Sequence, residues 1–202
     1  MSLFFFSTSF IGWFFETIVC LIADHRLSDR GFLTLPLCPV YGLPISIAYF
    51  CIGTPKEGVI VKLFAKIPAK TDEGKRWRFL GVIIAYFLMA AAIATLFELF
   101  AAILLKTLNA SMWDYGALPW NYKGFVCFSI SFIWGVLLTI SALTFLNPLF
   151  LGLSRLNKRV KRILSVCLWV LLASDVIFNL FYLKTNGRHY EWIFDNLHIL
   201  WL

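Results

Sequence analysis

Two glutamates stand out as residues that could do chemistry, because each lies inside a long apolar run. A carboxylate in hydrocarbon costs on the order of 3 kcal/mol, so it normally faces a protein interior, a polar partner or water. Glu16 and Glu98 each lie about seven residues before the predicted outer end of a span, roughly 10 Å below the outer surface. Equal depth predicts a shared polar cavity suited to proton coupling, cation binding or acid/base work. Alternatively, each glutamate bonds a neighbouring helix and holds the bundle together.

Further polar groups fall on the same predicted side of the membrane. Arg26 and Arg30 follow the first apolar run. The loop between the third and fourth runs adds Trp113, Asp114 and Tyr115. Guanidinium groups bind carboxylate or phosphate oxygens through paired donors, so an anionic headgroup or solute is a candidate ligand. Alternatively, the aromatic residues form an ordinary interfacial belt while the charges pair with one another.

The second apolar run begins with an unusual concentration of helix breakers, Pro36, Pro39 and Gly42. An interior proline removes a backbone donor and clashes with the preceding turn, so we expect this stretch to be kinked or partly unwound. Irregular backbone survives at membrane depth only where protein or a water-filled cavity satisfies its polar groups. The break therefore favours a binding site beside the glutamates, although a kink that only shapes the bundle stays open.

The composition indicates which elements position these residues. With 60% hydrophobic and 14% charged residues, the chain is typical of integral membrane proteins, and a water-soluble enzyme is excluded. Five apolar runs are long enough to cross a bilayer as helices, at about 3–23, 32–53, 79–105, 125–153 and 163–183. We predict an all-α bundle of about five transmembrane helices, with a proline-broken second span and a short amphipathic C-terminal tail from residue 185. Residues 1–153 form one predicted domain, and residues 154–202 hold the fifth span and the tail.

The net charge of +7 follows from the same topology. Most of the 18 Lys and Arg residues lie in the loops after the second and fourth runs, as is typical of cytoplasmic loops. We therefore predict a multi-pass protein of the cell membrane with a cytoplasmic N-terminus and no nucleic-acid partner. The loop 54–78 has a hydrophobic middle with Lys62 and Lys66 four residues apart, which indicates a surface helix on anionic lipid headgroups or a flexible basic linker.

The remaining polar and sulfur-bearing residues give weaker signals. Five cysteines without a CxxC pair or a histidine cluster are interpreted as small apolar fillers, so no metal site and no cofactor are expected. A disulfide among Cys20, Cys38 and Cys127 is an open alternative, since all three fall near one membrane face. Asp175, in the middle of the fifth run, either extends the polar interior or contacts a partner subunit.

Several strings of the sequence together resemble the putative ABC-transporter type IV family of bacterial membrane proteins. They are Gly12-Trp-Phe-Phe-Glu16, Asp29-Arg-Gly-Phe-Leu-Thr-Leu-Pro-Leu-Cys-Pro-Val-Tyr-Gly42, Glu98, Met112-Trp-Asp-Tyr115, Asn121-Tyr-Lys-Gly124 and Trp134-Gly135. They cover roughly residues 5 to 150, and the chain departs from the family pattern at Asp29 and Leu35. The resemblance implies a transporter permease. The sequence has no GxxxxGK[ST] phosphate loop, so ATP hydrolysis would fall to a separate subunit.

We therefore expect a permease-like component with an outward-facing polar site. Glu16 and Glu98 bind a cation or proton or steer the substrate, Arg26 and Arg30 attract an anionic group, and the Trp113–Tyr115 loop forms a lid. A homo-oligomer or partner subunits, including an ATPase at the basic inner loops, would complete the pathway. No catalytic residue is identified and a non-enzymatic role is favoured. The alternatives are a membrane-embedded enzyme acting on lipid headgroups or envelope precursors, and a non-transporting scaffold or sensor.

Overall fold

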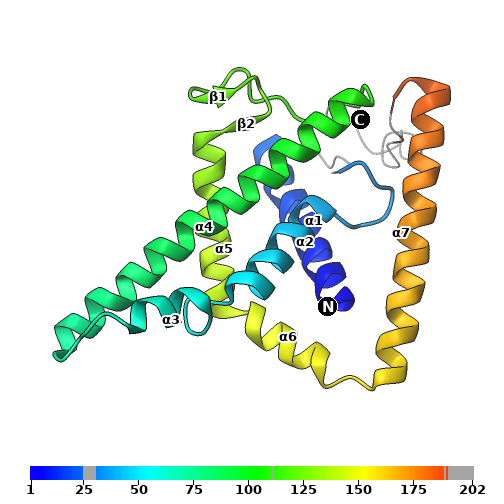
Figure 1. Ribbon diagram of the computed structural model, residues 1–202. Coiled ribbons are helices and arrows are strands. Elements are labelled where there is room, and N and C mark those ends of the chain that lie inside the picture. Colours follow the sequence, from blue (N-terminus) through cyan, green and yellow to red (C-terminus); the bar gives the residue numbers. More distant parts are fainter. Residues whose placement is uncertain (25–30, 111, 189, 191–202) are drawn as a thin grey trace. The chain divides into compact units, whose positions relative to one another are not determined.

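The computed structural model describes residues 1–24, 31–110, 112–188 and 190, and its ribbon is mostly helical (Figure 1). Within these residues, three helices are long and apolar enough to cross a membrane: α1 (Ser2–Asp24), α4 (Asp72–Thr107) and α7 (Lys158–Asn186). The bent pair α5 (Phe128–Thr144) and α6 (Leu146–Ser154) makes a fourth if it is one span. The prediction of a helical membrane protein is confirmed, whereas the count of five spans is not.

The chain divides into two compact units that are described separately. Unit 1 comprises Met1–Leu43, Ala101–Trp113 and Leu156–Leu202, and unit 2 comprises Pro44–Phe100 and Asp114–Arg155. Helix α4 begins in unit 2 and ends in unit 1. The predicted C-terminal tail lies outside the described residues from position 191 onward.

Unit 1 is built on contacts between α1 and α7. Phe5 stacks on Trp169 of α7 with ring centroids 5.5 Å apart, and Phe6 meets the same indole edge-on at 5.1 Å. Aromatic pairs in these geometries add stabilisation beyond their buried area. A buried hydrophobic cluster of this unit consists of Phe5, Phe6, Leu33, Leu37 and Leu172. Leu33 and Leu37 come from the stretch that precedes α2, so this stretch is anchored by apolar burial.

The predicted second span is only partly helical. Residues 31–38 contain no helix, and α2 (Pro39–Ile47) continues into a short π-helix, η1 (Ala48–Ile52). Proline is favoured in the first turn of a helix, where its missing N–H has no partner to lose. The combined segment Pro39–Ile52 is an apolar helix of 10–17 residues. It is therefore shorter than the roughly 20 residues that a membrane span needs. A proline-broken membrane span is therefore not confirmed.

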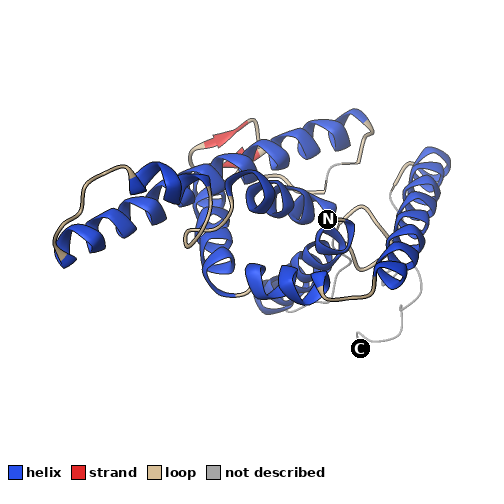
Figure 2. Cartoon of the chain, turned by 60° about the horizontal axis from the view of Figure 1, so that its bottom comes forward, coloured by secondary structure: helices blue, strands red, loops and turns tan. Residues whose placement is uncertain are grey.

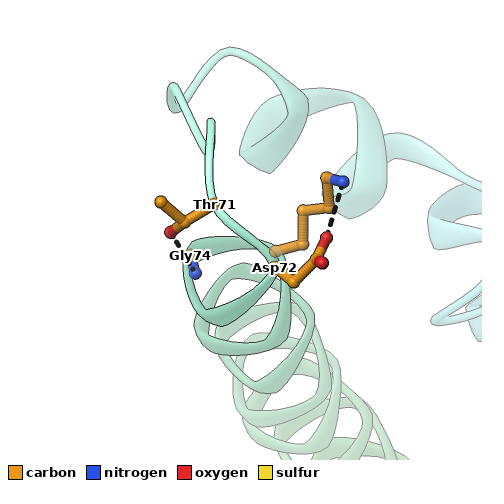
Figure 3. A network of polar contacts seen from close by, with 4 residues as sticks. Thr71, Asp72 and Gly74 are labelled. Carbon is orange, nitrogen blue, oxygen red and sulfur yellow. Dashed lines mark hydrogen bonds and ion pairs between the residues drawn. The ribbon is translucent and has the colours of Figure 1, made fainter.

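The basic loop between the second and third apolar runs holds helix α3 (Val59–Ala65) and the charged start of α4. A helix rather than a flexible linker thus occupies the hydrophobic middle of this loop. The Thr71 hydroxyl accepts a hydrogen bond from the Gly74 N–H at 3.1 Å, and Lys75 pairs with Asp72 at 2.9 Å (Figure 3). Because this cap starts α4 at Asp72, the helix begins seven residues before the predicted span.

The predicted fourth span is bent rather than straight. Helices α5 and α6 meet at an angle of 51° across the single residue Phe145. Pro148 lies in the first turn of α6 and cannot donate to the carbonyl four residues earlier, which accounts for the break. The Lys56 ammonium donates to the Leu143 carbonyl at 2.8 Å and so satisfies an acceptor at the end of α5.

A short hairpin interrupts the helices between α4 and α5 (Figure 2). Strand β1 (Asn121–Tyr122) pairs antiparallel with β2 (Val126–Cys127), with Asn121 opposite Cys127 and Tyr122 opposite Val126. The expectation of a purely α chain did not include this element. Its two strands give the loop before α5 a defined shape.

Candidate functional site

In unit 2, Glu98 of α4 is bound by a side chain of the following loop. Only 8% of Glu98 is exposed, and the Tyr115 hydroxyl donates to its Oε1 at 2.8 Å. Hydrogen bonds to an ionised acceptor are about twice as strong as neutral ones. This contact ties the loop to a carboxylate that lies within a predicted membrane span.

The loop that carries Tyr115 is held together by its own polar groups. Asp114 Oδ1 accepts from the Gly116 N–H at 2.8 Å, and Asn121 Oδ1 accepts from the Gly124 N–H at 3.0 Å. The Tyr115 N–H donates to the Gly124 carbonyl at 2.9 Å. Gly124 has φ +75°, and a Cβ there would collide with the Asp114 carboxyl, so glycine is required. Asp114 therefore shapes the loop, a role that the sequence analysis did not assign to it.

The other predicted site residues have different surroundings. Asp114 is exposed, and Trp113 belongs to unit 1 and is half-buried. Arg26 and Arg30 lie outside the described residues. The predicted anion-binding role of these arginines and the enzyme alternative that depends on it both stay predictions.

In unit 1, Glu16 of α1 lies beside the end of the non-helical stretch before α2. The Cys38 thiol donates to Glu16 Oε2 at 3.7 Å, and the Cys38 N–H donates to the Ser9 carbonyl at 3.1 Å. Sulfur donors form weak hydrogen bonds, so the backbone contact is the firmer of the two. All five cysteines of the chain are described and none forms a disulfide, so no disulfide links Cys20, Cys38 and Cys127.

Asp175 of α7 is a second carboxylate of unit 1, and its partner is backbone. Its Oδ2 accepts from the Leu35 N–H at 3.1 Å, while Oδ1 accepts from Asn179 at 3.2 Å. The Asn179 amide also donates to the Thr34 hydroxyl at 3.1 Å, and Asn179 is fully buried. Asp175 thus extends the polar interior, as one of the two alternatives from the sequence had it, and contact with a partner subunit stays a prediction. The spacing of Asp175 and Asn179 marked a polar helix face, but nothing in the sequence identified Leu35 as the partner.

The three predicted break residues have different surroundings. Pro36 is exposed, and Pro39 is the first residue of α2. Gly42 is buried against α1, where a Cβ would overlap the Ser9 side chain and lie 2.8 Å from the Phe5 carbonyl. At Gly12 of α1, a Cβ would lie 2.6 Å from the Tyr41 Cβ. Gly42 and Gly12 therefore allow close packing of two helices.

Glu16 and Glu98 fall in different units, so the structure describes each with its own neighbours only. Their predicted shared cavity stays a prediction. Within the described residues, no group of three or more His, Cys, Asp or Glu side chains is arranged to hold a metal ion.

Unit 2 contains one polar network that the sequence analysis missed. The Tyr49 hydroxyl donates to Asn147 Oδ1 at 2.8 Å, and the Asn147 amide donates to Glu57 Oε1 at 2.7 Å. The signal was an asparagine directly before Pro148 inside a long apolar run. This network links η1, the loop after it and α6 at the bend of the predicted fourth span.

Comparison with known proteins places the sequence in a family. The family described as putative ABC-transporter type IV matches residues 3–180, which includes all the strings quoted above and continues through most of α7. No curated protein and no solved structure matches the chain. The match and the apolar helices together indicate a transport-related membrane protein. Since the match covers most of its length, the chain belongs to the putative ABC-transporter type IV family.

Proposed function

We propose that this protein is a permease-like transporter component whose ligand site is the Glu98 carboxylate beneath the loop that carries Tyr115. The observation that carries the proposal is the hydrogen bond from the Tyr115 hydroxyl to buried Glu98. A carboxylate at membrane depth is expensive and typically marks an ion or substrate pathway. The Tyr115 phenol covers the Glu98 carboxylate, and its loop is held by its own hydrogen bonds, so the loop is suited to act as a lid over the site.

The chemistry of the proposed site is an exchange of partners. A cation or a proton that binds Glu98 takes over the charge that Tyr115 now stabilises, so the phenol is released. The loop keeps its own bonds between Asp114, Gly116, Asn121 and Gly124, so it moves as one body. Ligand arrival and loop opening are thereby linked through the hydrogen bond between Tyr115 and Glu98.

The wider arrangement follows the topology drawn from the sequence. We propose five membrane crossings of a bacterial cell membrane, with a cytoplasmic N-terminus and the Tyr115 loop outside. Glu16 steers a cation or proton, Arg26 and Arg30 attract an anionic group, and Trp113 contributes to the lid. The sequence contains no phosphate-binding loop for ATP, so energy would come from a separate subunit.

The same topology suggests the partners. The basic residues after the second run lie in α3, in the segments on either side of it and at the start of α4, and those after the fourth run lie around the α6–α7 connection. On the proposed cytoplasmic face, they are the contact sites for an ATPase. A chain of this size needs a second copy or other subunits to enclose a pathway.

A thermal-shift screen of the purified full chain tests the proposal without knowledge of the substrate. The ligands are monovalent and divalent cations, pH steps, phosphorylated lipids and small solutes. Wild type is compared with Glu98→Gln, and the matched control is Glu73→Gln, the same substitution at an exposed position of the same helix. A ligand at 100 times its Kd stabilises the folded state by about 2.7 kcal/mol.

We expect at least one ligand to raise the melting temperature of wild type and Glu73→Gln but not of Glu98→Gln. The proposal fails if every stabilising ligand acts equally on Glu98→Gln. It also fails if no ligand acts and the Glu98→Gln protein is merely less stable, since Glu98 is then interhelical glue.

A further inference from the structure

A second candidate site lies in unit 2, between α3 and the start of α4, away from the Glu98 loop in the sequence. It is a cavity of about 290 Å³, at the small end of the range for ligand pockets. Its lining combines apolar and cationic side chains, namely Pro55, Lys56, Val61, Phe64, Ala65, Lys75, Arg78, Phe79 and Val82. No acidic residue is among them. An apolar floor with a cationic rim is the complement of an anionic amphiphile.

The positive charge of the rim is largely uncompensated in the described contacts. Lys56 donates to the Leu143 carbonyl at 2.8 Å, and Arg78 donates to the Ile67 carbonyl at 3.5 Å, and both acceptors are neutral. Lys75 pairs with Asp72, but their side chains are 58% and 94% exposed. Such exposed ion pairs contribute only about 0–1 kcal/mol and yield to a better partner.

The position of the pocket along α4 places it where the membrane begins. The first two turns of α4 carry Asp72, Glu73, Lys75, Arg76 and Arg78, and from Phe79 to Phe97 the helix carries no charged residue. At about 1.5 Å per residue, its 36 residues extend well beyond 30 Å of hydrocarbon. Trp77 is 64% exposed at this boundary, as expected for an interfacial tryptophan. This pattern is expected of a helix that enters the hydrocarbon near Phe79, with the pocket at headgroup level.

Helix α3 is seated on α4 by close packing. A Cβ at Gly81 of α4 would lie 2.6 Å from the Phe64 ring, so the glycine makes room for that ring. Ile60 of α3 is buried, whereas Val59 and Leu63 are each 60% exposed. Val61 and Phe64, which line the pocket, are half-buried, whereas the apolar side chains of Val59 and Leu63 are left toward the surroundings. An apolar exposed face beside lysines is typical of a helix at a lipid surface.

We propose that this pocket binds one anionic phospholipid, with its phosphate between Lys75 and Arg78 and the start of an acyl chain over Val61, Phe64 and Val82. The cations select a negative headgroup, and the apolar floor selects a ligand with a hydrocarbon part over a free phosphate. The inference goes beyond the proposed function, because it requires neither a transported substrate nor an open Glu98 loop. It identifies a lipid that holds α3 against α4 at the membrane boundary.

Native mass spectrometry of the full chain in detergent micelles tests the site. Phosphatidylglycerol is titrated into wild type, Arg78→Gln and the double variant Lys75→Gln/Arg78→Gln. A basic residue near an anionic lipid contributes about 1 kcal/mol, so each substitution is expected to weaken binding about fivefold. The control is Lys62→Gln, an exposed lysine of α3 that does not line the pocket and whose loss should leave affinity unchanged. Lys56 is left intact, because it also bonds the end of α5.

A second set of measurements separates the pocket from general surface attraction. Ala65→Phe fills the cavity at an exposed position without removing a charge, and it is expected to reduce phosphatidylglycerol binding as strongly as the double variant. Phosphatidylcholine and glycerol 1-phosphate should bind weakly to wild type. The proposal is overturned if Lys62→Gln loses as much affinity as Arg78→Gln, if Ala65→Phe binds like wild type, or if glycerol 1-phosphate binds as well as the lipid.

Discussion

Each unit ties a non-helical segment to a carboxylate on a long helix, but the two ties differ in kind. In unit 1, Asp175 of α7 accepts from the backbone N–H of Leu35. In unit 2, Glu98 of α4 accepts from the side-chain hydroxyl of Tyr115. A backbone N–H cannot leave its acceptor unless the chain itself moves, whereas a phenol can turn away by side-chain rotation and find water. The comparison teaches that one carboxylate is part of the framework and the other is free to change partners.

The surroundings of the two segments support this distinction. The stretch 31–38 is fixed at both ends, because Leu33 and Leu37 are buried in the cluster of unit 1 and the Cys38 N–H bonds the Ser9 carbonyl. The loop after α4 is braced internally, through Asp114 and Asn121. We therefore expect the first segment to resist displacement and the second to move as a body.

The largest expected effect comes from overpacking the framework of unit 1. A leucine at position 42 would meet the Phe5 carbonyl and the Ser9 side chain, so Gly42→Leu is expected to cost about 3 kcal/mol or to abolish folding. The measurement is the yield of monodisperse protein and its melting temperature in detergent. Gly152→Leu is the matched control, because a Cβ there has nothing within 4 Å. Equal yields from both variants would show that α1 and α2 do not pack as described.

Removal of the framework carboxylate should have the next largest effect. Asp175→Ala leaves the Leu35 N–H and the buried Asn179 amide without this acceptor, at an expected cost of about 2 kcal/mol. Asp175→Asn keeps an acceptor oxygen and should recover most of that loss. The melting temperatures of wild type, Asp175→Ala and Asp175→Asn measure this loss. Asp72→Ala removes an exposed ion-pair partner and is the control, with an expected change in stability near zero. If Asp175→Ala melts at the same temperature as wild type, the hydrogen bond from the Leu35 N–H to Asp175 does not stabilise the fold.

The hydrogen bond between Tyr115 and Glu98 should affect the motion of the Tyr115 loop more than the stability of the fold. Tyr115→Phe removes the hydrogen bond to the Glu98 carboxyl group, for which we expect a loss of about 1.5 kcal/mol. Amide hydrogen exchange should then accelerate in residues 114–127 and stay unchanged in residues 31–38. Tyr122→Phe, at a 54% exposed phenol of the same loop, is the control. Faster exchange in both segments, or in neither, would remove the distinction between the two units.

The sequence predicted the helices well where length and apolar content decide the structure. The apolar runs at 3–23, 79–105 and 163–183 correspond to α1, α4 and α7, because a bilayer-length apolar segment has few alternatives to helix. Boundaries were less predictable. Helix α4 starts early because Thr71 caps it, and the run 125–153 bends at Phe145 because of Pro148, whose effect on direction depends on neighbours.

The sequence identified the candidate site residues more readily than it identified the contacts that they make. Glu16 and Glu98 were identifiable because charge is costly in an apolar run. Their partners were not, since Cys38 and Tyr115 have no pattern that marks them as donors. The bond between Leu35 and Asp175 joins residues 140 positions apart, and only the fold brings them together.

The most direct test of the account is the reactivity of Glu98 toward dicyclohexylcarbodiimide, a lipid-soluble reagent for protonated carboxyl groups, with adducts located by mass spectrometry. We expect slow modification of Glu98 in wild type and about tenfold faster modification in Tyr115→Phe, since about 1.4 kcal/mol changes an opening equilibrium tenfold. Asp175, held by backbone, should stay unmodified in both proteins. The account is contradicted if Glu98 reacts at the same rate in both, or if Asp175 reacts as fast as Glu98.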